Sequence, residues 1–210
     1  MKLTKFDHAC FVVEKEDRSI IVDPGNLTPN LQRLSPVEAI IITHQHADHF
    51  DPQLVRAILN DHPMAQIYTT ADVAPALSEY NIHIARPDEH RTAGPFSLRF
   101  YGELHARIHD GIEPISNIGV LIDEQIYYPG DALTIPDHTV TTLLLPVAAP
   151  WIKISESLAF AGDIRAPFVI PTHDAMLTPA GKQIIDGLAQ DYLGQRNITY
   201  QRLTQPIEIT

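Results

Sequence analysis

Cysteine and tryptophan are the scarcest residue types in this chain of 210 residues, which has one of each. The single cysteine, Cys10, cannot form a disulfide framework, and it excludes zinc sites built from several thiolates as well as C-x-x-C redox chemistry. A chain of this length buries about 70 % of its unfolded surface and needs no such covalent support. The length and the lack of a Gly/Ser-rich linker predict one domain over residues 1–210.

Long apolar runs are also missing. Runs such as Ala39–Ile42 and Leu143–Leu145 are far shorter than the roughly 20 residues of a membrane-spanning helix. The first twenty residues have no apolar core and carry acidic residues early, unlike a signal peptide. These absences predict a cytoplasmic protein that does not have a membrane as its partner.

Basic residues are few: 15 Lys and Arg stand against 26 Asp and Glu, which gives a net charge of −11. A nucleic-acid grip over the whole surface needs the opposite balance, so nucleic acid is not an expected partner. Histidine, by contrast, is abundant, with 11 residues. Histidine titrates near neutral pH and is a common metal ligand.

Hydrophobic periodicity predicts sheets that are covered by helices, which is a layered α/β arrangement. Strands are expected at Leu3–Phe6, Ala9–Glu14, Ser19–Asp23, Val37–Thr43, Gln66–Thr69, Phe96–His105, Gly119–Asp123, Gln125–Tyr128, Thr142–Pro146 and Phe168–Pro171. Helices are expected at Ala71–Glu79, Ser155–Asp163, Pro179–Tyr192 and after the capping residue Asp51. Ile184, Ile185, Leu188 and Tyr192 are expected to be the buried face of the last helix.

The most informative segment reads T-H-Q-H-A-D-H and spans Thr43–His49, between a predicted buried strand and a capped helix. His44 and His46 are two residues apart, so in extended backbone both rings project to one side and can bind one ion. Asp48 and His49 follow the start of the turn, where they can face a second ion. These ligand types suit Zn²⁺, and also Fe or Mn. The alternative is a solvated polar loop.

This segment resembles the defining motif of the metallo-β-lactamase-fold hydrolases, residue for residue. Four more segments carry the resemblance along the chain: I-V-D-P-G at 21–25, G-E-L-H-A at 102–106, Y-P-G-D at 128–131 and P-T-H-D at 171–174. The segment F-D-H-A-C-F at 6–11 is similar to the early strand of the ascorbate-6-phosphate lactonase-like branch, with Asp7 where glycine is usual. The resemblance implies an αββα sandwich of two mixed β-sheets flanked by helices.

Carried over position by position, the resemblance also implies two divalent metal ions, with zinc first and manganese or iron as alternatives. It places His44, His46 and His105 at one ion, Asp48, His49 and His173 at the other, and Asp131 between them. Two such cations activate a water molecule for hydrolysis, and Asp48 is the catalytic residue expected to steer it. Asp23 is expected behind the ligands, where it orients a ligand histidine.

Five residues are weaker candidates for substrate contact: His8, His109, Asn117, Trp151 and Lys153. His109 also competes with His105 as a ligand, and the Gly102 segment favours His105. A cleft wall formed by Trp151 and Lys153 would favour an anionic substrate, while core packing of Trp151 and solvation of Lys153 explain both equally well. For His8 the alternative is a buried, hydrogen-bonded strand residue.

The expected function is a metal-dependent hydrolase that acts on a small anionic ester, lactone or amide. One alternative is a phosphodiesterase or nuclease, which the missing basic stripe disfavours. Another is a non-catalytic metal-bearing binding protein, although a structural zinc closes its site with only four ligands. The expected partner is a small-molecule substrate, and self-association into a homo-oligomer, common among relatives, is a further expectation.

Overall fold

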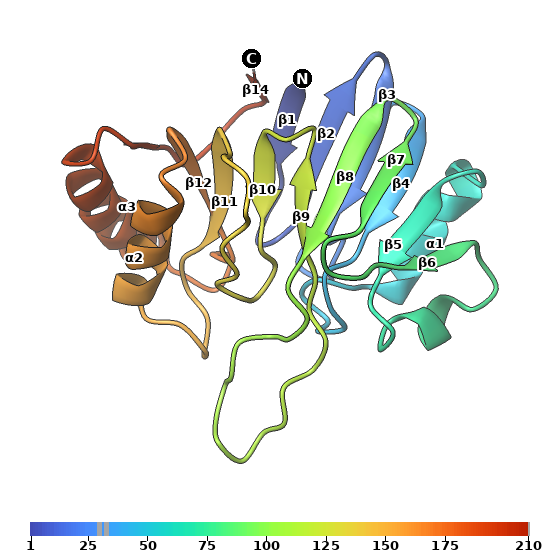
Figure 1. Ribbon diagram of the computed structural model, residues 1–210, viewed down its shortest axis with the longest axis horizontal. Helices are drawn as coiled ribbons and strands as arrows, with labels where there is room; N and C mark the ends of the chain where they lie inside the picture. Colours follow the sequence, from blue (N-terminus) through green and yellow to red (C-terminus); the bar gives the residue numbers. More distant parts are fainter. Residues whose placement is uncertain (29–30, 32–33, 210) are drawn as a thin grey trace.

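Two seven-stranded β-sheets form the body of the computed structural model, which describes residues 1–28, 31 and 34–209. The strand order is β14-β1-β2-β3-β4-β5-β6 in the first sheet and β13-β12-β11-β10-β9-β8-β7 in the second. Helices flank the pair of sheets (Figure 1). Both sheets combine antiparallel and parallel pairs. The αββα sandwich predicted from the sequence is therefore confirmed.

The first sheet opens with a hairpin, as predicted. Its strands are β1 (Lys2–Lys5), β2 (Phe11–Lys15), β3 (Arg18–Val22), β4 (Val37–Ile41), β5 (Gln66–Thr69), β6 (Ile82–Ile84) and β14 (Ile207–Glu208). β2 and β3 pair antiparallel with Phe11 opposite Val22, and β4 then joins β3 in parallel. The carboxyl end of β4 is the point at which the histidine-rich loop begins.

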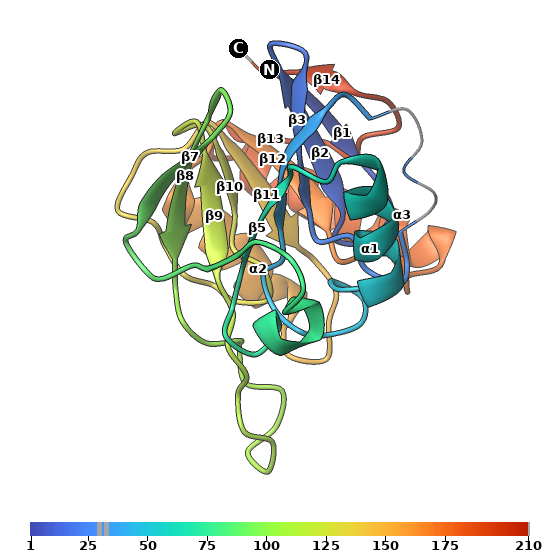
Figure 2. The same ribbon diagram turned by 90° about the vertical axis from the view of Figure 1, so that its right-hand side faces the viewer.

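The second sheet supplies the other loops of interest. Its strands are β7 (His90–Ala93), β8 (Phe96–Tyr101), β9 (Gly119–Ile122), β10 (Ile126–Tyr128), β11 (Thr142–Pro146), β12 (Phe168–Thr172) and β13 (Thr199–Tyr200). β7 to β10 run antiparallel to one another, whereas β10 to β13 pair in parallel. The segment between β8 and β9 extends away from the sandwich as a long loop (Figures 1 and 2).

Three α-helices and one 3-10 turn occur in the described part of the chain. They are α1 (Pro52–Asp61), η1 (Ala74–Leu77), α2 (Ile154–Ile164) and α3 (Pro179–Gly194). Asp51 caps α1 as predicted, because its carboxylate accepts from the backbone N–H groups of Gln53 and Leu54. Thr178 caps α3 in the same way. None of these helices is long and apolar enough to cross a membrane.

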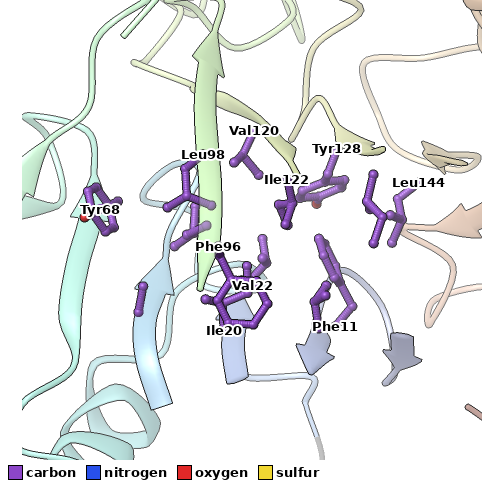
Figure 3. Close-up of a cluster of buried hydrophobic side chains, with 14 of the residues drawn as sticks. Phe11, Ile20, Val22, Tyr68, Phe96, Leu98, Val120, Ile122, Tyr128 and Leu144 are labelled. Atoms are coloured by element: carbon purple, nitrogen blue, oxygen red, sulfur yellow. The ribbon is translucent and has the colours of Figure 1, made fainter. Parts of the chain in front are cut away.

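The core consists of three apolar layers. The central layer lies between the sheets, where Phe11 and Ile20 of the first sheet face Phe96 and Tyr128 of the second (Figure 3). A second layer packs β4 and β5 against α1. A third layer packs β11 and β12 against α2 and α3. Strands covered on both faces explain the continuous apolar runs at β4 and β11.

The structure corrects three secondary-structure predictions. Ile184 and Leu188 of α3 are 65 % and 49 % exposed, so the buried face of this helix is carried by Ala189 and Leu193 instead. The helix expected at Ala71–Glu79 is only the short turn η1. The strand expected to reach His105 ends at Tyr101, because the chain turns at Gly102 with φ of +76°.

Candidate metal centre

Loops that follow β4, β8, β10 and β12 bring the predicted ligands together. The loop after β4 carries four of them and lies against Gly25. A Cβ at Gly25 would stand 1.9 Å from the Asp48 carbonyl oxygen, so only glycine allows this close approach. Backbone bonds from Asn26 N to Ala47 O and from Asp51 N to Pro24 O hold the two segments together.

The candidate ligands form two adjacent groups. In each group the donor atoms lie within 4.8 Å of one another: His44, His46, His105 and Asp131 in the first, and His8, Asp48, His49 and His173 in the second. Asp131 reaches the second group as well, with 3.3 Å from Oδ1 to His49 Nε2 and 3.1 Å from Oδ2 to His173 Nε2. The seven side chains that the sequence assigns to two metal ions thus occupy one place, and His109 is not among them.

Several buried polar atoms in this place have no hydrogen-bond partner within the described part of the chain. They are Nε2 of His49, Nε2 of His105, Nε2 of His173 and Oδ1 of Asp131. A buried polar atom without a partner costs about 1–3 kcal/mol. These atoms belong to the two adjacent groups, and cations bound within the groups would give them partners. The residues present therefore fit divalent metal ions that prefer imidazole and carboxylate ligands.

In each of the three histidines the other ring nitrogen, Nδ1, faces a hydrogen-bond acceptor. Nδ1 of His49 lies 2.7 Å from Asp23 Oδ2, Nδ1 of His173 lies 2.7 Å from the Ala148 carbonyl oxygen, and Nδ1 of His105 bonds to the Ala106 carbonyl oxygen. Because Nδ1 carries the ring proton and donates a hydrogen bond to the acceptor, Nε2 is unprotonated and its lone pair can bind a cation. This is the arrangement by which proteins orient metal-binding histidines.

Asp23 lies behind the ligands, fully buried at the end of β3, and accepts several hydrogen bonds there. Its carboxylate accepts from the backbone N–H and the hydroxyl of Thr43 at 2.8 and 2.7 Å, and from His49. The Thr43 hydroxyl in turn lies 3.0 Å from His44 Nδ1. Since that hydroxyl donates to Asp23, it accepts from the Nδ1–H of His44, and the unprotonated His44 Nε2 lies 3.1 Å from His46 Nδ1. Thr43 is a contributor that sequence reasoning missed.

The buried carboxylates and imidazoles of this site shift one another's pKa values. Burial alone would lower the pKa of His49, but Asp131 and Asp23 outweigh it and raise that pKa well above the usual range. The pKa of His44 is instead well below normal because of burial and the nearby His49. Burial acts to raise the pKa of Asp131, yet the surrounding histidines hold it well below normal. A cation bound at His49 would therefore compete with a proton for the same nitrogen.

The turn that presents Asp131 is held by Asn117. Asn117 Nδ2 donates to the Pro129 carbonyl oxygen at 2.9 Å, and its Oδ1 accepts from the Asp131 N–H at 3.0 Å. Between them, Gly130 has φ of +64°, and a Cβ there would lie 2.4 Å from Asn117 Oδ1. The structure places the buried Asn117 amide against this turn, and its contact with a substrate stays a prediction.

Trp151, half-buried in the loop after β11, contacts the same carboxylate from another side. Its indole Nε1 donates to Asp131 Oδ2 at 2.8 Å, and its ring lies edge-on to His105 with centroids 5.8 Å apart. Core packing alone does not describe this position, because the indole N–H bonds to a candidate ligand. A role of Trp151 in the wall of a substrate cleft stays a prediction. Trp151 orients the carboxylate that both ligand groups share.

Of the remaining candidates for substrate contact, only His8 lies within the cluster. His8 is 1 % exposed and lies inside the second group, not on its surface. His109 is exposed in the loop between β8 and β9, where its Nδ1 accepts from the Gly111 N–H. Lys153 is exposed at the start of α2, and the described residues give its ammonium group no ion pair. The structure therefore supports neither His109 nor Lys153 as part of the cluster.

Comparison with known proteins supports the same assignment. The pattern of the Beta-lactamase superfamily domain matches residues 2–173. Protein Rv0786c of Mycobacterium tuberculosis is 34 % identical over 194 residues, which cover 89 % of this chain and 90 % of that protein. A protein of Nanoarchaeum equitans named UPF0173 metal-dependent hydrolase NEQ378 is 22 % identical over 191 residues, with 82 % and 83 % covered.

The fold is shared with solved structures. Igni18, described as a metallo hydrolase from Ignicoccus hospitalis, superposes with a TM-score of 0.73 at 17 % identity, and the match covers 100 % of this chain and 99 % of that one. Identity at this level shows the fold alone, while the match over residues 2–173 reaches through every candidate ligand. The chain belongs to the beta-lactamase superfamily, and it is a hydrolase of that superfamily with the metallo-β-lactamase fold.

Proposed function

We propose that this hydrolase holds two divalent metal ions, most simply zinc, and uses them to hydrolyse an ester, lactone or amide bond of a small anionic molecule. The observation that carries the proposal is the convergence of seven imidazole and carboxylate side chains, among which four buried nitrogen and oxygen atoms lack a hydrogen-bond partner in the described part of the chain. When bound, two adjacent cations lower the pKa of a water molecule and polarise the substrate oxygen.

The chain's own residues would divide the remaining work. His44, His46 and His105 would hold the first ion, and Asp48, His49 and His173 the second. Asp131 lies within reach of both groups and would hold the pair together. The side chain of Asp48 is 29 % exposed, against 5 % or less for His49, Asp131 and His173. Of the two carboxylates, Asp48 is thus the better placed to orient a water molecule that arrives from solvent.

The proposed preference for an anionic substrate follows from the charge of the metal ions and not from a lysine. Two divalent cations beside the two carboxylates Asp48 and Asp131 would leave the site positive within a chain of net charge −11. An anionic group near the scissile bond would be attracted to this site. Lys153, the sequence-based candidate for that role, is exposed at the start of α2, and its contact with an anionic substrate stays a prediction.

The direct test is metal stoichiometry with matched histidine variants. Chelator-stripped protein is reloaded with zinc, desalted and analysed for metal and protein. We expect two equivalents in the wild type and in His109→Ala, and at most one in His105→Ala, although both histidines belong to the same loop. Equal metal content in the two variants would contradict the ligand set.

The bond type requires an activity panel. Wild type, Asp131→Ala and the exposed control His90→Ala are assayed against lactones, thioesters, carboxylic amides and phosphodiesters. We expect hydrolysis of at least one carboxylic-acid derivative, with the activity lost in Asp131→Ala and kept in His90→Ala. Turnover of phosphodiesters alone would favour the phosphodiesterase alternative, and retained turnover in Asp131→Ala would refute the shared carboxylate.

A further inference from the structure

His8 lies among the candidate ligands although it is far from the motif in sequence. It belongs to the turn between β1 and β2, is 1 % exposed, and has φ of 57°. Its ring centroid is 4.0 Å from that of His173 and 5.9 Å from that of His49. By proximity alone His8 could be a fourth ligand of the second group. Its hydrogen bonds indicate a different role.

The direction of each bond fixes the position of the ring proton. The backbone N–H of Ala175 approaches His8 Nδ1 at 3.3 Å. A backbone N–H can only donate, so Nδ1 is an acceptor and the proton of the neutral ring is on Nε2. Nε2 lies 2.8 Å from Asp48 Oδ2, and a carboxylate oxygen can only accept. His8 therefore donates to Asp48 through Nε2.

This tautomer is the reverse of that found in the ligand histidines. His49, His105 and His173 each point Nδ1 at an oxygen acceptor and leave Nε2 free. In His8 the nitrogen that faces the cluster carries the proton and has no lone pair to offer. A cation could bind it only if the bond from Ala175 and the bond to Asp48 were both given up.

The backbone of His8 is anchored as firmly as its ring. Its carbonyl oxygen accepts from the His173 N–H at 3.0 Å and from the Lys5 ammonium at 2.6 Å. The left-handed conformation is unfavourable for a residue with a Cβ. These contacts hold it in place, and together they join the turn after β1 to the loop after β12. The ring is thus presented to Asp48 from a fixed support.

We infer that His8 is a positioning residue of the proposed dinuclear centre, which holds the Asp48 carboxylate through Nε2–H and binds no metal itself. The inference rests on the proposed function. Asp48 is a partly exposed ligand, with 29 % of its side chain accessible, and is the one expected to orient the attacking water. A donor that fixes one of its oxygens restricts rotation of the carboxylate, which matters more for the geometry of the reaction than for retention of the ions.

The tautomer can be read directly by NMR. Ring-¹⁵N-labelled wild type loaded with zinc is recorded in a long-range ¹H–¹⁵N correlation experiment, with assignment of His8 by its loss in His8→Gln. We expect a protonated Nε2 and an unprotonated Nδ1 at His8, and the opposite pattern at His49, His105 and His173. A His8 ring with its proton on Nδ1 and zinc on Nε2 would overturn the inference.

Variants separate positioning from ligation. His8→Phe removes the donor, and His8→Gln restores an N–H at a similar distance. In both we expect two equivalents of zinc, as in the control His90→Phe, whereas His173→Ala loses at least one. We expect kcat to fall about 10–100-fold in His8→Phe with KM little changed, and to recover in part in His8→Gln. Loss of one zinc equivalent from folded His8→Phe would make His8 a ligand.

The two levels of proposal fail differently. If wild-type protein does not take up two equivalents of zinc, the dinuclear hydrolase is refuted. If the wild type is loaded but His8 shows the ligand tautomer, only the positioning role is refuted. Should His8→Phe not fold, the NMR measurement on the wild type still decides.

Discussion

His173 shows how a single residue couples the candidate centre to pH. Burial would lower its pKa, but the carboxylates of Asp131 and Asp48, 3.1 and 3.3 Å from Nε2, outweigh burial and raise the pKa to about 9. Its Nε2 is also the atom that a metal ion would bind. Proton and cation therefore compete for one lone pair, and each ion bound there below about pH 9 must release a proton.

We accordingly expect zinc affinity to rise with pH and to level off above about pH 9. The slope between pH 6 and 8 should be at least about tenfold per pH unit, the value for release of one proton. Competition with a chromophoric chelator, corrected for protonation of the chelator itself, measures this dependence. An affinity that stays constant from pH 6 to 9 would show that His173 is not a ligand.

Trp151 gives the centre an intrinsic optical reporter, because it is the sole tryptophan of the chain and bonds directly to Asp131. Zinc titrated into chelator-stripped protein should change the emission of this indole until the sites are filled, since the charge on its acceptor carboxylate is neutralised. Fluorescence titration measures the effect, with Asp131→Ala as the control that should not respond. An unchanged emission in wild type that has bound zinc would place Asp131 outside the metal centre.

At the scale of the secondary-structure element, a glycine has opposite effects on stability in a helix and in a ligand loop. Gly187 lies exposed within α3, and a Cβ there meets nothing within 4 Å. Gly25 lies beneath the ligand loop, where a Cβ would meet the backbone of Asp48 and His49. Gly187→Ala should raise the free energy of unfolding by about 0.5–1 kcal/mol because alanine is the better helix former.

Gly25→Ala should lower the free energy of unfolding by about 1–3 kcal/mol and reduce zinc content, because the loop must move to admit the methyl group. Urea unfolding followed by circular dichroism compares both variants with the wild type. If Gly25→Ala kept full stability and two equivalents of zinc, the close packing of this loop against residues 24–26 would be wrong.

The elements that the sequence predicts well are those with a local cause. The hairpin of β2 and β3 follows from Val/Ile/Phe-rich segments around a charged turn, and α1 follows from Asp51 and the proline after it. The prediction fails where distant contacts decide. Ile184 and Leu188 fit an apolar face, but β13 and α2 cover the other side of α3, so Ala189 and Leu193 are buried there instead. The short edge strands β6, β7, β13 and β14 are too brief to have a periodicity of their own.

The same division holds for the candidate centre. His44, His46, Asp48 and His49 could be found because their chemistry is concentrated in six residues. His105, Asp131 and His173 could be found only by resemblance to a family, since each is an isolated residue after a strand. The contacts of His8 with Asp48 and of Trp151 with Asp131 span 40 and 20 residues, and no spacing rule relates such pairs. Hydrogen-bond direction, which separates ligand from support, exists only in three dimensions.

On the scale of the whole molecule, the candidate centre joins the two sheets. Its ligands come from the loop after β4 in the first sheet and from loops after β8, β10 and β12 in the second. Metal ions bound there would link the two halves of the sandwich to each other. Occupancy of the site should therefore stabilise the entire fold and not only one loop.

We expect removal of metal by a chelator to lower Tm. At a free zinc concentration of 100 times Kd, each site adds about 2.7 kcal/mol, or roughly 5–10 °C for a chain of this size. Differential scanning calorimetry of loaded and stripped protein measures the shift, and His109→Ala should show the same shift as the wild type. Stripped and loaded proteins with equal Tm would mean that the ions do not connect the sheets.

The separation of the ligands along the chain also has a consequence for biosynthesis. Four ligands precede residue 50, but Asp131 and His173 are made far later. While the polypeptide is still growing on the ribosome, the early histidines have no partners from the second sheet with which to enclose an ion. Loading of the complete centre is therefore a late event, which must await translation beyond residue 173 and docking of the final strands.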